Sequence, residues 1–208
     1  MVMKILLSDA GKRYNREWIF RHLNYEFSSG NAYAITGNNG SGKSTLLQVI
    51  AGAVHHNEGS ITYHFNGKDV PAHEHFNHIA MAAPYLELVE EMTLTEFLEF
   101  HFNFKPLLPG CTVTDVINQL ELQRSAGKQI RYFSSGMKQR VKLAQAVFSN
   151  VPVLLLDEPC TNLDAQGYAL YHRLIEEFCN DRLIIVSSND ETEYKFCHFT
   201  LPVTSFKP

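Results

Sequence analysis

The segment that most constrains this chain is the glycine-rich run of residues 37–44, which reads Gly-Asn-Asn-Gly-Ser-Gly-Lys-Ser. It matches the pattern Gly-x-x-x-x-Gly-Lys-Ser/Thr, in which glycines allow a tight turn whose backbone N–H groups point inward at phosphates. The pattern needs a strand before it and a helix after it, and the hydrophobic spacing predicts both, over Ala32–Thr36 and Lys43–Ala53. A glycine-rich turn with a chance lysine is the alternative, but so many features in the right order favour a nucleoside triphosphate site.

The residues of this phosphate loop have distinct expected roles. The Lys43 ammonium can reach the β- and γ-phosphates, and the Ser44 hydroxyl can ligate Mg²⁺. The helix that follows aims the positive end of its dipole at the anion. We therefore expect nucleotide-binding residues at Gly37, Asn38, Asn39, Gly40, Ser41, Gly42, Lys43, Ser44 and Thr45.

Two carboxylates follow a buried strand predicted over Val153–Leu156. Asp157 and Glu158 would emerge at the carboxyl edge of that strand. There Asp157 would hold Mg²⁺ through its water shell, and Glu158 could take a proton from attacking water. On its own, this pattern is also that of an ordinary strand before a solvated acidic turn. Together with the phosphate loop, it predicts the second half of a nucleotide site.

The order of elements predicts an α/β fold with a parallel central sheet. Short strands dominate the first third, helices the middle and buried strands the last third. A capped helix is expected to begin at Thr93-Leu94. The other predicted pieces are strands over Lys4–Ser8, Trp18–Phe27, Ser60–Phe65 and Leu183–Val186, and helices over Thr114–Leu122, Ser135–Phe148 and Ala165–Cys179.

Composition excludes several classes of protein. A length of 208 residues is about one domain's worth, and 45% apolar with 12% aromatic residues argue against disorder. A formal net charge of -4 disfavours a strongly basic nucleic-acid binder. No run approaches the roughly 18–20 apolar residues of a membrane span, and the N-terminus does not suit a signal peptide. The 4 cysteines are widely spaced and suggest neither a zinc site nor a disulfide framework. We expect a soluble, cytoplasmic protein.

Residues 133–140, Phe-Ser-Ser-Gly-Met-Lys-Gln-Arg, lie between the two halves of the predicted site. Serine and glycine at a helix start offer free N–H groups and a hydroxyl to an anion, although a plain serine N-cap would look the same. This run resembles the signature of the ATP-binding cassette (ABC) ATPase family, commonly Leu-Ser-Gly-Gly-Gln followed by a basic residue and Gln-Arg. Ser135 stands in place of a glycine and Met137 in place of the first glutamine.

Two further segments carry the resemblance. Pro159–Asp164 looks like the family's D-loop, with Asp164 as its last residue, and Tyr14 is similar to the aromatic residue that stacks on adenine. A tyrosine near a strand edge can also be simple packing. The likeness extends from Lys12 to about Asp190. It implies a P-loop NTPase core with an antiparallel β-subdomain, formed by residues 1–84 and 151–208, and an α-helical subdomain over residues 85–150.

The resemblance also implies ATP and Mg²⁺ as cofactors, and a dimer with a second copy or a paralogous ABC subunit. Ser134, Ser135 and Gly136 of one chain would contact the γ-phosphate bound by Lys43 of the other, and Glu158 would act as general base. ATP binding and hydrolysis would energise separate transmembrane subunits, with this chain at the inner face of a membrane and no nucleic-acid partner. A soluble or mechanotransmitting ABC ATPase that signals to a non-transporter partner is the alternative.

Two polar residues of the family pattern are missing. Pro84 stands where the family usually has a glutamine near the Mg²⁺ and the attacking water, and no glutamine between residues 48 and 119 can replace it. Asn189 stands in place of the switch histidine. Asparagine can donate a hydrogen bond to a γ-phosphate but cannot carry a proton near neutral pH. The catalytic residues expected are Lys43, Glu158 and Asn189, and hydrolysis is expected to be slow.

The run His73–His78 contains three histidines, His73, His75 and His78. Histidine is a common metal ligand, but the run has no second ligand pair nearby in the sequence. A solvated loop is therefore the favoured interpretation.

Overall fold

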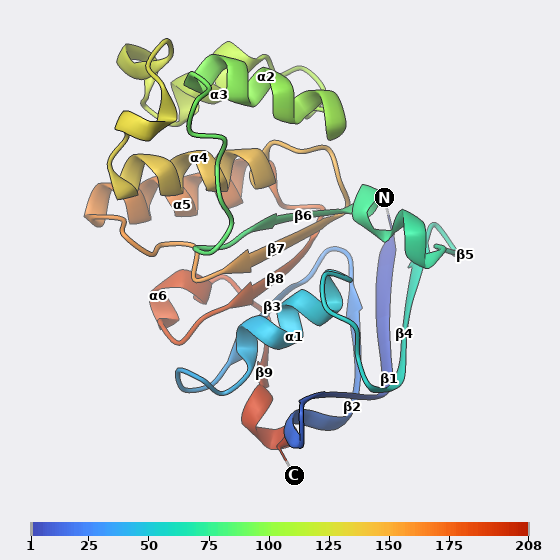
Figure 1. The fold of residues 1–208 in the computed structure, drawn as a ribbon. Helices are drawn as coiled ribbons and strands as arrows, with labels where there is room; N and C mark the ends of the chain where they lie inside the picture. The colour runs from blue at the N-terminus through green and yellow to red at the C-terminus, as the bar shows by residue number, and fades with distance from the viewer. Residues whose placement is uncertain (1, 208) are drawn as a thin grey trace. The chain divides into compact units, whose positions relative to one another are not determined.

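The computed structural model of the chain describes residues 2–207, and these residues form two compact units (Figure 1). The first unit contains the residues up to Met81, Pro152–Glu158 and the residues from Asp181 onward. The second consists of Ala82–Val151 and Pro159–Asn180. Pro159–Asn180, which the expected division places in the core, thus groups with the helical unit, because its helix packs against another helix there.

The first unit is built on a five-stranded sheet. β8 runs parallel to β7 and to β3, and β3 runs parallel to β9. Every residue of β7 and β8 is buried, as is typical of strands covered on both faces. The order across the sheet is β6 (Ile79–Ala82), β7 (Val153–Asp157), β8 (Leu183–Ser187), β3 (Ala32–Thr36) and β9 (Phe199–Pro202). The predicted α/β fold with a parallel central sheet is confirmed.

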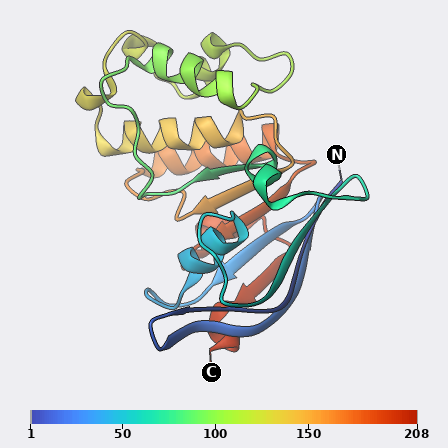
Figure 2. The ribbon, with the colours of Figure 1, turned by 45° about the vertical axis from the view of Figure 1, so that its right-hand side comes forward.

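A second, antiparallel sheet in this unit has the order β2 (Glu17–Ser28), β1 (Met3–Tyr14), β4 (Glu58–Phe65) and β5 (Lys68–Asp69). Figure 2 shows the long, curved hairpin of β1 and β2. The predicted end of the first strand at Ser8 is wrong, since β1 continues to Tyr14. Register shifts after Leu7 and Ala10 explain the difference, because bulges let a strand bend without giving up its pairing.

One apolar core joins these elements of the first unit. Leu46, Leu47 and Ile50 of α1 (Lys43–Ile50) belong to the same cluster as Leu155 of β7 and Ile185 of β8. α1 ends before the predicted Ala53 because Gly52 adopts the left-handed conformation, with φ 74°, that terminates many helices. Short helices complete the unit, at η1 (Ala72–His78), α6 (Glu191–Tyr194) and η4 (Val203–Phe206).

The histidine run forms η1, and His75 Nε2 lies 2.9 Å from the Val70 carbonyl oxygen. Across residues 2–207, no group of three or more His, Cys, Asp or Glu side chains is placed to hold a metal ion. The rings of His75 and His78 lie against Tyr63 and Phe65 of β4, and His73 Nε2 lies 3.5 Å from Glu74 of the same run.

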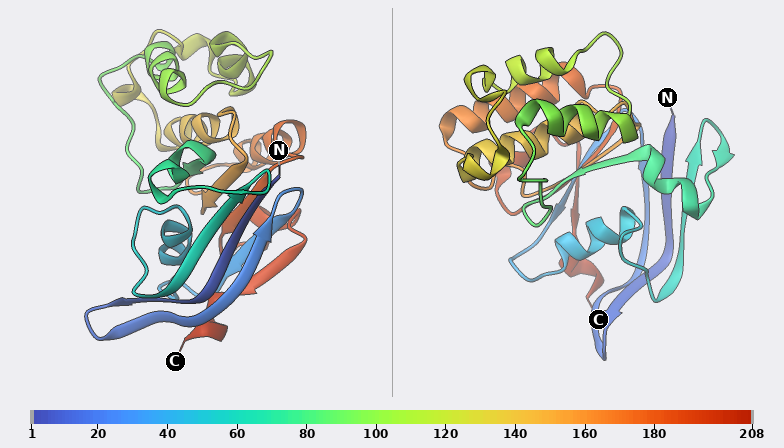
Figure 3. Two further views of the ribbon diagram at one scale, coloured as in Figure 1. Left: turned by 90° about the vertical axis from the view of Figure 1, so that its right-hand side faces the viewer. Right: turned by 45° about the horizontal axis from the view of Figure 1, so that its top comes forward.

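The second unit is helical, and Figure 3 shows its two longest helices, α4 and α5, side by side. Thr93 caps α2 as predicted, and the backbone N–H and hydroxyl of Thr93 lower the pKa of the Glu96 carboxyl by donating to it. His101 of α2 lies 3.0 Å from the Gln145 carbonyl oxygen of α4. The elements are α2 (Leu94–Phe104), α3 (Val113–Gln119), η2 (Gln123–Ser125), η3 (Ile130–Tyr132), α4 (Ser135–Val147) and α5 (Ala165–Phe178).

Candidate nucleotide-binding site

The phosphate loop connects β3 to α1 within the first unit. Gly37 and Gly42 have φ angles of 147° and 105°, which side chains other than hydrogen rarely tolerate. Space is lacking as well: a Cβ at Gly42 would collide with Ile19, and one at Gly37 would collide with Ser41. Backbone and packing therefore both require glycine at these two positions.

The N-terminus of α1 has no side-chain cap. Gly42 is the N-cap residue and supplies no side-chain acceptor, and the first turn of the helix holds no acidic residue. The first backbone N–H groups of an α-helix have no partner inside the helix, and together with the helix dipole they favour an anion. A bound phosphate group would supply the missing acceptors.

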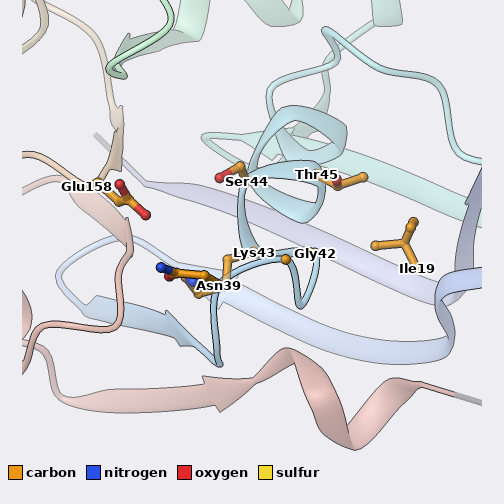
Figure 4. Close-up of a pocket in the computed structure, with 8 residues that line it drawn as sticks. Ile19, Asn39, Gly42, Lys43, Ser44, Thr45 and Glu158 are labelled. Atoms are coloured by element: carbon orange, nitrogen blue, oxygen red, sulfur yellow. The ribbon is translucent and has the colours of Figure 1, made fainter.

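A cavity of about 220 Å³ lies over the loop (Figure 4). Glu158 reaches it from the end of β7, on the opposite side from Lys43 and Ser44 of α1. The complete lining is Ile19, Asn39, Gly40, Gly42, Lys43, Ser44, Thr45 and Glu158. The structure thus brings the phosphate loop and one of the two predicted carboxylates to a single pocket.

Lys43 is held inside the loop. Its side chain is buried, and Nζ donates hydrogen bonds to the carbonyl oxygens of Gly37, at 2.9 Å, and Asn38, at 3.4 Å. The ammonium group therefore stays at the mouth of the anion site, tied only to neutral acceptors. An anion in the pocket meets a positive charge that no carboxylate in residues 2–207 already neutralises through an ion pair.

Asp157 ends β7 and is only 1% exposed. Within residues 2–207, neither of its carboxylate oxygens has a hydrogen-bond partner. A buried carboxylate without a partner is costly, and a bound cation removes the cost. Asp157 and the Ser44 hydroxyl offer the hard oxygen ligands that Mg²⁺ prefers, usually one or two protein groups beside phosphates and water. These residues therefore fit the expected ion.

Glu158 turns away from the strand at a strained position. Its φ angle of 40° is uncommon for a residue with a side chain, and its backbone N–H donates to the Ser187 carbonyl at 2.8 Å. That bond to the neighbouring strand holds the turn in place. The result is a carboxylate that is half-buried and lines the pocket, where Asp157 is fully enclosed.

Asn189 reaches the phosphate loop from the segment after β8. Its Nδ2 donates a hydrogen bond to Asn39 Oδ1 at 3.1 Å, and both residues are exposed. The structure therefore brings Asn189 to the same loop that carries Lys43, through a side chain that sequence analysis did not pair with it.

Tyr14 is not among the residues that line this pocket. It is 47% exposed at the end of β1, where the Lys12 ammonium lies 4.7 Å from the centre of its ring. Ile19 of β2 does line the pocket, although it is not among the residues predicted from the sequence. An isolated isoleucine in an apolar strand carries no sequence signal that separates it from ordinary packing.

The signature residues form a pocket of their own within the second unit, with a volume of about 380 Å³. Ser134 caps α4 by accepting a hydrogen bond from the Met137 N–H at 3.3 Å, so it has the structural role of a plain N-cap. Asp164 caps α5 through the Gly167 N–H at 2.8 Å. The lining is Leu122, Ser134, Ser135, Gly136, Met137, Arg140, Asn162, Leu163 and Asp164.

Pro84 also lies in the second unit, in the segment after β6. Its carbonyl oxygen accepts a hydrogen bond from Lys142 Nζ of α4 at 2.6 Å. Pro84, which stands in place of a glutamine of the family pattern, can therefore accept hydrogen bonds only through its carbonyl oxygen. That oxygen already accepts one from Lys142.

A comparison with known families decides the classification. The model of the family described as "ABC transporter" matches residues 20–161, which is more than half of the chain and includes the phosphate loop, the signature run and both carboxylates. This chain belongs to the ABC transporter family.

A relative is similar to this chain in sequence, and two solved structures are similar to it in fold. The chain is 28% identical over 193 residues to "Uncharacterized ABC transporter ATP-binding protein YybJ" of Bacillus subtilis, which covers 91% of this chain and 88% of the relative. The fold matches a putative ABC transporter ATP-binding protein from Pyrococcus furiosus with a TM-score of 0.82, at 20% identity and covering 99% and 100% of the two chains. It also matches a dimeric ATP-binding cassette in a post-hydrolysis state with ADP and Pi, with a TM-score of 0.80, at 22% identity and covering 96% and 95%.

ABC membership accounts for the two-part architecture, and the expected P-loop core with its antiparallel sheet and helical unit is confirmed. None of the helices described between residues 2 and 207 has the length and apolar character needed to cross a bilayer.

Proposed function

We propose that this chain is the ATP-binding and ATP-hydrolysing subunit of an ABC transporter. The observation that carries the proposal is the juxtaposition at one pocket of the phosphate loop and Glu158, beside a buried Asp157 whose carboxylate has no partner in residues 2–207. A loop built for phosphate, a carboxylate suited to Mg²⁺ and a second carboxylate open to solvent are the parts that nucleotide hydrolysis needs.

Binding rests on groups that exist before the nucleotide arrives. The N–H groups of the phosphate loop and of the first turn of α1 take phosphate oxygens, and Lys43 moves its hydrogen bonds from loop carbonyls to the phosphates. Ser44 and Asp157 would hold Mg²⁺. The chemistry that the ion would supply there is neutralisation of charge on the β- and γ-phosphates.

Hydrolysis rests on Glu158 and Asn189. Glu158 is half-buried at the pocket, where its carboxylate can accept a proton from the attacking water. Asn189 donates a hydrogen bond from the loop's edge, where it can turn from Asn39 Oδ1 to a γ-phosphate oxygen. It offers no proton that titrates near neutral pH, so the rate is low.

The complete site needs a second chain. Ser134, Ser135 and Gly136 would meet the γ-phosphate bound by the partner's loop, and Asp164 would lie at the same junction. The start of α4 favours this arrangement, because the first backbone N–H groups of a helix have no helical partners and Ser134 caps only that of Met137. The dimeric form of the cassette with ADP and Pi described above also favours it. The partner is a second copy or a paralogous subunit.

ATP-driven closure of the dimer would then drive separate transmembrane subunits, with this chain at the inner face of the membrane. The name of the Bacillus subtilis relative, a transporter ATP-binding protein, favours this output over a signal to a soluble partner. Purification of the tagged chain from detergent-solubilised membranes should recover multi-span proteins. Recovery of soluble partners alone would favour the alternative ABC function.

The core of the proposal is tested by binding of ATP to the purified protein with Mg²⁺ or with EDTA, alongside phosphate release. We expect binding in both conditions, tighter with Mg²⁺, and measurable phosphate release. Asp157→Asn should lose the Mg²⁺-dependent gain, whereas Asp69→Asn, at an exposed hairpin, should keep it. Failure of the wild-type protein to bind ATP would refute the proposal.

The slow ATP hydrolysis that we propose can be tested by substitution of Asn189. Asn189→His should raise kcat by about tenfold, because an imidazole restores a group that can hold and donate a proton beside the γ-phosphate. Steady-state phosphate release measures the change, and Asn180→His, on an exposed residue of the helical unit, is the matched control. A variant no faster than the wild type would mean that Asn189 does not limit turnover.

A further inference from the structure

Ser187 carries a buried hydroxyl group that no hydrogen bond satisfies within residues 2–207. It ends β8 after four apolar residues, it is 0% exposed, and its Oγ has no hydrogen-bond partner within residues 2–207. A buried hydroxyl that makes no hydrogen bond lowers stability, so an alanine would serve the fold at least as well. The next residue is different: Ser188 Oγ accepts a hydrogen bond from the Asp190 N–H at 2.9 Å.

The sheet places Ser187 beside Asp157. The two residues are partners in the parallel register of β7 and β8, and neighbours in register point to the same face of a sheet. That face carries Leu155 and Ile185, which pack with α1, so the two side chains lie on the side of the sheet from which α1 and Ser44 approach.

The side chains of Ser187 and Asp157 do not form a hydrogen bond with each other in the described residues 2–207. The Ser187 hydroxyl could donate to the Asp157 carboxylate, yet both oxygens of Asp157 also have no partner among the described residues. Two polar groups that share one face of a sheet without a direct hydrogen bond between them can be joined by a water molecule. Because Asp157 is suited to hold a cation, such a water would belong to the hydration shell of that cation.

We propose that Ser187 is a positioning residue of the Mg²⁺ site, whose hydroxyl binds a water ligand of the ion held by Asp157 and Ser44. The inference rests on the proposed function, because it needs Mg²⁺ at this site. The backbone of Ser187 also contributes, because its carbonyl oxygen accepts a hydrogen bond from the Glu158 N–H. One residue therefore orients the ion through its side chain and the predicted general base through its main chain.

The test compares Ser187→Ala with the wild type in ATP binding, as the Mg²⁺ concentration is titrated and activity is not needed. We expect unchanged ATP affinity in EDTA and a half-saturating Mg²⁺ concentration raised by about tenfold, as for other groups that orient metal ligands. Thermal unfolding without nucleotide should show a melting temperature equal to that of the wild type or higher, because the substitution removes an unsatisfied hydroxyl.

Ser149→Ala is the matched control. Ser149 is also fully buried, but its Oγ donates to the Gln145 carbonyl in the helical unit. That variant should melt at a lower temperature without nucleotide and should need the same Mg²⁺ concentration as the wild type. Ser187→Ala should instead need more Mg²⁺ without a fall in melting temperature. The two variants together therefore separate a role at the ion from a role in folding.

Distinct results would overturn the two proposals. An unchanged Mg²⁺ requirement in Ser187→Ala, or a fall in its melting temperature like that of Ser149→Ala, refutes the role of Ser187 and leaves the proposed function standing. If the wild-type protein binds ATP equally well with Mg²⁺ and with EDTA, the Mg²⁺ site itself is wrong and the role of Ser187 fails with it.

Discussion

Glu158→Gln is expected to lower ATP turnover by at least about a hundredfold while leaving ATP binding intact. The amide keeps the size of the carboxylate and the φ angle of 40°, but it cannot accept the proton of the attacking water. Because Glu158 is half-buried and its backbone N–H is held by Ser187, the substitution should leave the pocket in place.

The same variant should accumulate the closed state. With ATP bound and not hydrolysed, the two copies of the proposed dimer should remain joined, so light scattering should show a stable dimer with Mg²⁺ and ATP and a monomer after ATP is removed. Glu177→Gln, an exposed glutamate on α5, is the matched control and should retain wild-type turnover. Equal rates for Glu158→Gln and the wild type would refute hydrolysis at this pocket, and a strict monomer would count against the dimer.

Lys43→Ala is expected to weaken ATP binding by about a hundredfold or more. The ammonium group is buried and points into the loop, where its hydrogen bonds are to Gly37 and Asn38 carbonyls. In the bound state it meets β- and γ-phosphate charge at short range in a partly enclosed site, where charge-assisted hydrogen bonds are strongest. Equilibrium binding of a fluorescent ATP analogue measures the loss directly.

A lysine of the exposed hairpin provides the comparison for Lys43. Lys68→Ala, in β5, removes the same charge at the surface and should leave affinity unchanged. Circular dichroism should show both variants folded, since the loop backbone is set by its glycines. Wild-type affinity in Lys43→Ala would mean that phosphate does not bind at this loop.

Much of the site could be predicted from the sequence because its parts are local. The loop of residues 37–44 needs only neighbouring glycines, a preceding strand and a following helix, and each leaves its own mark along the chain. Asp157 and Glu158 were predicted for the same reason, since two carboxylates directly after an apolar strand must emerge at its edge.

Other parts depend on which strand lies beside which, and short-range patterns do not contain that information. The sequence predicts that β1 ends at Ser8, because a nearby glycine looks like a strand terminator when the partner of the strand is unknown. Ile19 lines the pocket only because β2 brings it against Gly42. Asn189 donates a hydrogen bond to Asn39, a residue 150 positions away in the chain.

The sequence by itself determined that this protein carries a phosphate loop, a pair of carboxylates and an ABC signature, since each depends on residues close together in the chain. Only the tertiary structure decided which other side chains share the site. The parallel register of β7 and β8 sets Ser187 beside Asp157, and burial leaves both without partners in residues 2–207. Register and burial arise from packing of the whole sheet, which is why a serine at the end of a strand lies beside the carboxylate that we propose holds the ion.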